Sequence, residues 1–361
     1  MPSSRAEAVR ITALLNVRDE WPLAAVAIVH CLLHHADDLY VLDHGSQDGT
    51  AAGLARLRNS PLGERLHLYE LRDPAFHEEA FRNALVEITQ ASEPSWIYSL
   101  DADEFLYAPS GLRTLLAGIP PAIQCLSYPL ENWVAPRDFD ETRLADYGRI
   151  GARALPDRSE PLQDSRSVLA IQQGQLNYFQ LPFGRKVIFR PGPRAWLRAG
   201  CHEVLPRCPE QTLALHRDYL RGMHLPFTGL EKLRRKSAMG RRHCADGKPP
   251  WYGWQSQMLS QLDALGALEA FWQRHSHDPA LERGSAGMPE GVSVAIEPHF
   301  QEALRPALDW LEGTDVLSGE HHPSAPVDPL PEALYHLALR ATDALDGALQ
   351  ADGSGGGKAR I

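Results

Sequence analysis

The first hundred residues alternate between short apolar runs and longer amphipathic stretches, and this alternation constrains the fold more than any other feature of the chain. The short runs are typical of buried strands, whereas the stretches between them repeat apolar residues at helical spacing. Strands separated by helices favour an α/β fold whose sheet is largely parallel. The predicted strands cover residues 11–17, 37–43, 65–71 and 95–100, and the predicted helices cover residues 19–36, 50–58 and 75–91.

Beyond residue 106 the alternation fades, although further apolar runs follow. Residues 134–181 are polar and lack a clear period, which is typical of a long loop or lid. The Gly/Ser-rich end, residues 351–361, is expected to be a flexible tail. The remaining predictions are strands at 123–133 and 183–192, a basic helix at 228–245, and helices at 254–274, 297–313 and 330–349, the last three within a C-terminal helical extension over 250–350.

Charge and composition exclude several classes of protein. The 361 residues carry a formal net charge of −10, which argues against a general affinity for nucleic acid or for an anionic membrane. The longest apolar stretch, WPLAAVAIVHCLL, is too short to be a transmembrane segment, and no signal peptide is visible. The five cysteines are scattered and odd in number, which predicts no disulfide framework and fits a reducing cytoplasm.

Polar side chains follow three of the predicted strands at the point where each strand ends. Asn16 and Arg18 close the first strand, Asp43 closes the second, and Asp101 and Asp103 follow the fourth. Ligands of parallel α/β sheets bind beyond the carboxyl ends of the strands. We therefore expect these side chains to share one site.

The stretch SLDADEF, residues 99–105, crowds Asp101, Asp103 and Glu104 into four positions. Like charges this close repel unless water, a basic side chain or a metal ion compensates them. A solvated turn is the simplest interpretation of an arbitrary Asp-x-Asp pair. At the end of a strand in a parallel sheet, the pair favours Mg²⁺ or Mn²⁺ that also holds phosphate groups. The sequence NVRDEW after the first strand lacks the glycines of a dinucleotide-binding turn, and no Walker loop is present.

The motifs of the first 110 residues resemble those of glycosyltransferase family 2-type enzymes, which have the Rossmann-like GT-A fold. LDADEF resembles the branch of that family whose motif reads Asp-x-Asp-Glu-Phe, and GRKVIFRP, CHEV and MHLPF match later elements of the branch loosely. Residues 110–245 match only in these scattered motifs, and nothing matches beyond residue 250. The matching residues of the opening are Asn16, Arg18, Asp19, Glu20, Asp43, Ser46, Asp48, Gly49 and Thr50, followed by Arg82 and Asn83.

The resemblance implies a GT-A domain over 8–245, with a nucleotide-binding half (8–110) and an acceptor half (111–245). It implies that Asp43 meets the base or ribose of a nucleotide, assisted by the segment from Asn16 to Arg18. The residues expected to bind a nucleotide sugar are Asn16, Arg18, Asp43, Arg82, Asp101 and Lys186. The residues expected to hold the cofactor, Mn²⁺ or Mg²⁺, are Asp101, Asp103 and His224.

The resemblance also implies an inverting reaction, in which an acceptor hydroxyl loses its proton to a positioned base. We favour Glu203 in GCHEV as that base, with a structural ion pair as the alternative role of this carboxylate. His202 is expected to orient the acceptor or to act as the base itself. Glu131 and Asp138 are the other candidates.

The favoured function is a metal-dependent transferase that moves a sugar from a nucleotide-diphosphate sugar, UDP-linked rather than GDP- or dTDP-linked, to a glycan, lipid-linked or small-molecule acceptor. The alternatives are a non-catalytic GT-A module that binds nucleotide or glycan, and a metal-dependent sugar-nucleotide phosphoesterase or pyrophosphorylase. The resemblance suggests bacterial polysaccharide biosynthesis, in the cytoplasm or at the inner face of the membrane. Residues 250–350 are candidates for acceptor binding or homo-oligomer contacts.

Overall fold

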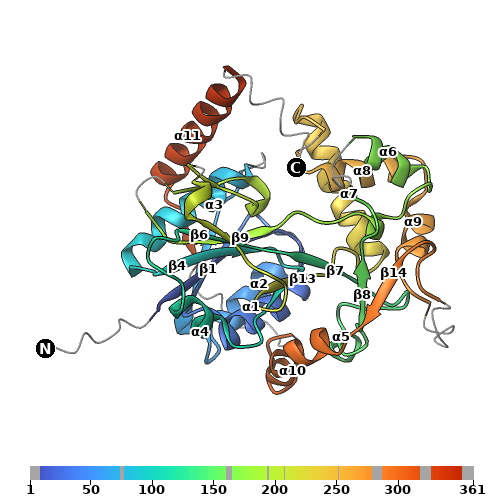
Figure 1. Ribbon diagram of the computed structural model, residues 1–361, viewed down its shortest axis with the longest axis horizontal. Coiled ribbons are helices and arrows are strands. Elements are labelled where there is room, and N and C mark those ends of the chain that lie inside the picture. Colours follow the sequence, from blue (N-terminus) through green and yellow to red (C-terminus); the bar gives the residue numbers. More distant parts are fainter. Residues whose placement is uncertain are drawn as a thin grey trace, which may run out of the picture.

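The computed structural model describes residues 9–73, 77–159, 165–192, 195–206, 208–250, 252–278, 287–317 and 327–351 (Figure 1). The predicted flexible tail lies outside the described residues from position 352 onward. Among the described helices, none combines the length and apolarity needed to cross a membrane.

Within the described residues the central sheet has eight strands, and among these only β9 runs antiparallel to its neighbours. The four strands predicted from the opening alternation lie side by side in the order β3-β2-β1-β4. This arrangement confirms the expected fold class, a mostly parallel sheet flanked by helices. In sheet order the strands are β12 (Thr212–Ala214), β6 (Cys125–Tyr128), β9 (Lys186–Phe189), β4 (Trp96–Leu100), β1 (Ile11–Val17), β2 (Asp38–Asp43), β3 (Leu66–Glu70) and β15 (Asp328–Pro329).

Helices cover both faces of this sheet (Figure 1). Alternate residues of the strands pack against α1 and α2 on one face and against α3 on the other, so the strands are continuous apolar runs. Two later helices form outer layers, because α10 packs on α1 and α11 packs on α3. The bounds are α1 (Leu23–His34), α2 (Thr50–Arg58), α3 (Glu78–Thr89), α10 (His299–Glu312) and α11 (Glu332–Ala351).

The outer layer explains the composition of α1. Every residue from Leu23 to Leu32 is buried, although a helix on the surface of a sheet normally keeps one polar face. Helix α10 covers the face that would otherwise meet solvent, and its buried residues Phe300 and Leu304 join the same core. The apolar character of α1 all around its axis therefore follows from a partner more than 250 positions later in the chain.

A second sheet of five strands adjoins the first. Its strand β5 begins directly after the acidic turn, so Asp101 and Asp103 lie where the chain passes from one sheet to the other. The predicted strand 123–133 is in fact two strands, β6 and β7, separated at Pro129 and belonging to different sheets. In order, the second sheet contains β14 (Ser293–Ile296), β8 (Ala152–Leu155), β7 (Leu130–Val134), β13 (Arg221–His224) and β5 (Glu104–Tyr107).

The expectation of a long loop over 134–181 is wrong, because this stretch contains β8 and two helices. The predicted helix 254–274 is divided into α8 and α9 at Gly266, whose φ of 67° lies in the left-handed region. The predicted extension, 250–350, contains helices and also supplies β14 and β15 to the two sheets. The remaining elements are α4 (Leu112–Ala117), α5 (Leu144–Tyr147), α6 (Ser165–Gln172), β10 (Trp196–Leu197), β11 (Val204–Leu205), α7 (Leu230–Ala245), α8 (Trp254–Ala264) and α9 (Leu268–Arg274).

Candidate active site

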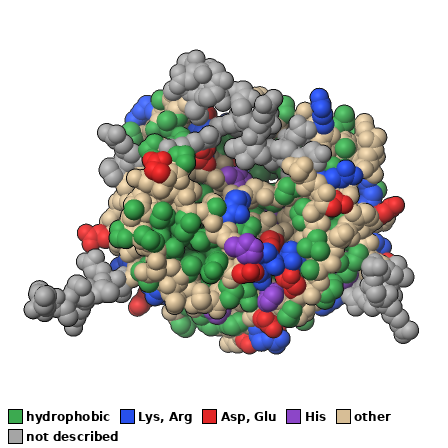
Figure 2. Space-filling view, viewed as in Figure 1, with side chains coloured by type: hydrophobic (Ala, Val, Ile, Leu, Met, Phe, Trp, Pro, Cys, Tyr) green, Lys and Arg blue, Asp and Glu red, His purple; other side chains and the backbone are tan. Residues whose placement is uncertain are grey.

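A pocket of about 290 Å³ opens at the carboxyl ends of the parallel strands. Its walls come from the loop after β1 (residues 18–20), the loop after β2 (residues 47–48) and one face of α7 (residues 235–242). Acidic, basic and histidine side chains gather near the middle of the face shown in Figure 2. The pocket lies where ligands of parallel α/β sheets bind.

The acidic side chains of the two strand-end loops hold the loops together. Asp19 Oδ1 accepts hydrogen bonds from the backbone N–H groups of Gln47 (2.6 Å) and Asp48 (3.2 Å). Asp48 Oδ1 in turn accepts the N–H of Thr50 at 2.7 Å, at the start of α2. The φ of 54° at Asp19 is a left-handed conformation that Asp tolerates better than most residues. These acids therefore shape one wall of the pocket.

The two residues expected to meet the nucleoside lie at neighbouring strand ends. Asp43 is buried at the end of β2, and its Oδ1 accepts hydrogen bonds from the N–H (2.9 Å) and hydroxyl (2.6 Å) of Ser46. Burial raises the pKa of Asp43, although these hydrogen bonds act in the opposite direction. Both polar side-chain atoms of Asn16 on β1 are buried without a hydrogen-bond partner in the protein. A buried amide without hydrogen-bond partners lowers stability. Such a group is typical of a site where a ligand supplies the missing hydrogen bonds.

Asp101 is held by two cations. Its Oδ1 accepts a hydrogen bond from Arg82, and its Oδ2 lies 3.0 Å from Lys186 Nζ. Lys186, on β9, is 1% exposed and also contacts Glu104 Oε1 at 2.9 Å. Burial alone would lower the pKa of Lys186, but Asp101 and Glu104 outweigh this effect and raise it well above its ordinary value. The predicted residues Arg82, Asp101 and Lys186 therefore form one ion-paired group.

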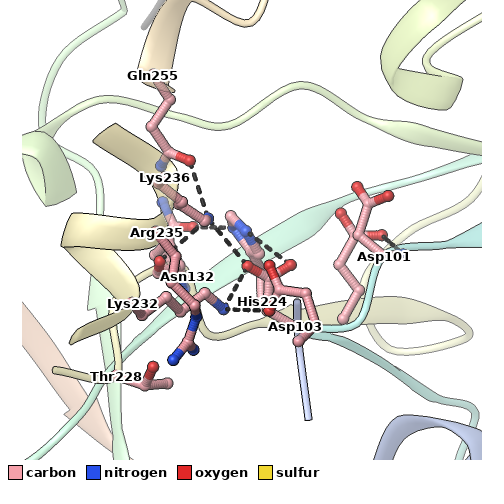
Figure 3. Close-up of polar contacts among 12 residues, drawn as sticks. Asp101, Asp103, Asn132, His224, Thr228, Lys232, Arg235, Lys236 and Gln255 are labelled. Carbon is pink, nitrogen blue, oxygen red and sulfur yellow. Dashed lines mark hydrogen bonds and ion pairs between the residues drawn. The ribbon is translucent and has the colours of Figure 1, made fainter. Parts of the chain in front are cut away.

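Asp103 is held by two lysines of α7 (Figure 3). Its Oδ2 lies 2.8 Å from Lys232 Nζ and 3.1 Å from Lys236 Nζ. Burial acts to raise the pKa of Asp103, but the two ammonium groups hold it well below its ordinary value. His224 Nε2 approaches the other carboxylate oxygen to 3.8 Å. Asp103 is therefore fully charged and already compensated by protein groups.

The two predicted histidines are neutral and flank one aromatic ring. The ring of Phe183 lies 4.8 Å from that of His224 and 6.1 Å from that of His202, between centroids. His202 Nδ1 donates to the carbonyl of Arg185 at 2.7 Å, which leaves Nε2 with its lone pair. Partial desolvation of the ring and the nearby charge of Lys186 lower the pKa of His202 to about 4, although part of this side chain is exposed. Burial lowers the pKa of His224 to about 3. His224 Nδ1 is hydrogen-bonded to Asn132 Oδ1 at 2.7 Å.

The three residues predicted to ligate Mn²⁺ or Mg²⁺ do not form a metal centre as they lie. Only Asp103 and His224 face each other, whereas Asp101 lies to one side of them with Arg82 and Lys186. Within the described ranges, no group of three His, Cys, Asp or Glu side chains is arranged to hold a metal ion. Lys232 and Lys236 both contact Asp103 Oδ2, so ammonium groups already bind the carboxylate oxygen that would attract a divalent ion.

The candidate bases occupy different environments. Glu203 is half-buried and directly precedes β11, beside His202. Glu131 pairs with Arg217 at 2.6 Å, and Asp138 pairs with Arg149 at 2.6 Å. The last two carboxylates therefore have structural ion pairs. Glu203 is in the same short segment as His202.

The residues that sequence analysis missed are the basic side chains of α7. The stretch was predicted as a basic helix, but no role was given to its charges. Their spacing was the available signal, because residues three or four apart share one face of a helix. The four that contact Asp103 or line the pocket are Lys232, Arg235, Lys236 and Arg242.

No protein-family model matches the chain, and no curated protein matches it either. Among solved structures it is similar to S. aureus TarS 1–349, at 12% identity and a TM-score of 0.36, with 65% of each chain covered. A second structure of S. aureus TarS gives 13% identity and a TM-score of 0.34, covering 64% of this chain but 40% of the other. Mannose-1-phosphate geranyltransferase from Thermus thermophilus gives 12% identity and a TM-score of 0.23, covering 74% and 68%. The chain thus spans less than two thirds of either TarS structure.

Proposed function

We propose that this protein is a glycosyltransferase that transfers a sugar from a nucleoside-diphosphate sugar to an acceptor hydroxyl. The observation that carries the proposal is the pocket at the carboxyl ends of β1 and β2, which has a basic wall whose Lys236 contacts Asp103. A polar pocket with one wall of arginine and lysine side chains, at this edge of a parallel sheet, suits a ligand with phosphate groups. The sequence resemblance of the same segments to sugar-nucleotide enzymes supports this assignment.

The pocket and the polar residues at the neighbouring strand ends have separate tasks in such a reaction. Asn16 and Asp43 offer a hydrogen-bonding amide and a carboxylate to the nucleoside. The basic side chains of α7 lie where they can stabilise the negative charge that grows on the leaving diphosphate, and stabilisation of that charge speeds bond cleavage. Asp101 is kept ionised by its two cations and can accept hydrogen bonds from hydroxyl groups of the donor.

The acceptor hydroxyl needs a base, and the segment from His202 to Glu203 supplies two. His202 is neutral near pH 7 and has a free lone pair on Nε2, since its proton is on Nδ1, which donates a hydrogen bond to a backbone carbonyl. Glu203 is the carboxylate that we propose as the base, with His202 orienting the acceptor. Replacing Glu203 by Gln should lower kcat more than it weakens donor binding, because the proton is transferred only in the chemical step.

The proposal is tested with a panel of sugar nucleotides, with UDP-sugars first, and with glycan, lipid-linked and small-molecule acceptors. Release of nucleoside diphosphate that increases with acceptor supports a transferase. Binding of nucleotide without turnover supports a non-catalytic module instead, and release of nucleoside monophosphate or of free pyrophosphate supports a phosphoesterase or pyrophosphorylase. Arg241→Ala is the control variant, because Arg241 pairs with Asp263 at 2.6 Å on the exposed side of α7.

A further inference from the structure

The acidic cluster is already balanced by protein cations. The sequence predicts a bound dication because the clustered carboxylates would otherwise repel one another. In the structure each of them contacts at least one basic group, so this reason no longer applies. The carboxylates are those of Glu20, Asp101, Asp103 and Glu104, and the cations are Arg82, Lys186, Lys232 and Lys236.

The lysines leave little room for a metal ion at Asp103. Lys232 is 1% exposed and lies between Asp103, at 2.8 Å, and Glu20, at 3.9 Å. Lys236 is fixed by Asp103, by Gln255 Oε1 at 3.0 Å and by a backbone carbonyl at 3.3 Å. A divalent ion on Asp103 would lie beside two ammonium groups, and like charges at such distances repel strongly in a buried site.

The pocket wall also carries positive charge that the protein does not compensate. In the described part of the chain, Arg242 makes no ion pair. Arg18 has a loose contact of 3.8 Å with Asp19 and a long hydrogen bond of 3.5 Å from its guanidinium to His44 Nδ1. The Nε–H groups of Arg18 and Arg235 are buried without a hydrogen-bond acceptor, although another nitrogen of Arg235 pairs with Glu141 at 2.8 Å. Burial, together with the neighbouring charge of Arg242, lowers the pKa of Arg18. Unpaired cations and unsatisfied donors that face one pocket are the features of an anion site.

Resting on the function proposed above, we propose that the basic wall of α7, together with Arg18, neutralises the diphosphate of the donor in place of a divalent ion. Arg242 is the group on α7 that contacts the phosphates, and Arg235 and Lys236 add positive charge at the same wall while they stay paired with Glu141 and Asp103. Asp103 is a positioning residue that fixes Lys236 at the pocket wall, and it is not a metal ligand.

The charges balance in this reaction without a metal. The bond between the sugar C1 and the phosphate oxygen breaks, and its electron pair stays on the diphosphate, which gains one negative charge. The acceptor oxygen forms the new bond to C1 and gives its proton to the base. The fixed guanidinium and ammonium groups stabilise the added charge on the diphosphate as it develops.

Calorimetric titration of the full chain with UDP, GDP and dTDP tests the proposal, each in EDTA and each with MnCl₂. We expect at least one nucleotide to bind in EDTA with a dissociation constant within about threefold of that in MnCl₂, a difference under about 1 kcal/mol. Binding that is lost in EDTA and restored by MnCl₂ would overturn the inference but leave the proposed function standing. Failure of all three nucleotides in both buffers would count against the proposed function itself.

Neighbouring arginines on α7 provide a matched pair of variants. Arg242→Ala should weaken nucleotide binding in EDTA by about tenfold or more, since a charge-assisted contact to phosphate is worth roughly 1.5 to 3 kcal/mol. Arg241→Ala removes the same charge from the exposed side of the helix and should change binding by less than about twofold. Equal effects of the two variants would show that only net charge matters and would overturn the assignment of a built phosphate site.

Discussion

Replacing Asp103 by Asn should destabilise the protein strongly, and this result would separate an ion-paired acid from a metal ligand. The change keeps the size of the side chain but removes the charge that faces two ammonium groups, at 2.8 Å (Lys232) and 3.1 Å (Lys236). Lys232 is 1% exposed, and its next carboxylate, Glu20, is 3.9 Å away. Removing one partner of a buried ion pair costs roughly 3 to 5 kcal/mol.

The expected loss can be read as a shift in melting temperature. With an unfolding entropy of about 2.1 cal/mol/K per residue, the full chain has about 0.76 kcal/mol/K, and the loss corresponds to about 4 to 7 °C. Urea and thermal unfolding, each followed by circular dichroism in EDTA, measure it. Asp138→Asn is the control, because the ion pair of Asp138 is 59% exposed on the acidic side and should contribute less than about 1 kcal/mol. The double variant Asp103→Asn/Lys232→Met should recover part of the loss, since it no longer buries an unpaired ammonium.

The opposite outcome has a clear meaning. If Asp103 were one of several like charges waiting for a metal, neutralising it in EDTA would relieve repulsion and leave the protein as stable as the wild type or more stable. A melting temperature of Asp103→Asn equal to or above that of the wild type would therefore refute the ion-pair assignment.

Three further predictions concern the scaffold around the site. Gly240→Ala should cost about 1 to 3 kcal/mol despite its better helix propensity, because the added Cβ would lie 1.9 Å from the carbonyl oxygen of Ser256 where α7 meets α8; urea unfolding measures the loss. Asn83→Ala should cost about 2 to 4 kcal/mol in the same assay, because the buried side chain of Asn83 bonds both the N–H and the carbonyl of Leu197, and an unchanged stability would contradict this. His275 is neutral in the folded state, since burial lowers its pKa to about 3, whereas the unfolded chain takes up a proton below about pH 6.5. The free energy of unfolding should therefore fall as the pH falls from 6.5 towards 3, by up to about 1.4 kcal/mol per pH unit for this group. For His275→Gln, the unfolding free energy plotted against pH should have a smaller slope over that range.

Much of the first hundred residues of the fold could be predicted from the sequence. The strand predicted at 11–17 coincides with β1, and the helix predicted at 50–58 coincides with α2, because period and composition report directly which side chains are buried. The same analysis placed Asp43, Asp101 and Asp103 at strand ends, and the parallel sheet brings those ends to one edge. The second sheet was not predicted, because its strands are short and pair with strands far away in the sequence, as β13 does with β5.

The sequence by itself determined that four apolar strands alternate with helices and that an acidic turn follows the last of them. Those properties are local, since they depend on which side chains along a few consecutive residues must leave water. Only the tertiary structure decided what compensates the acids, because Lys232 and Lys236 are separated from Asp103 by 129 and 133 positions. Their approach depends on how α7 packs across the ends of the strands, and no spacing within the sequence fixes that distance.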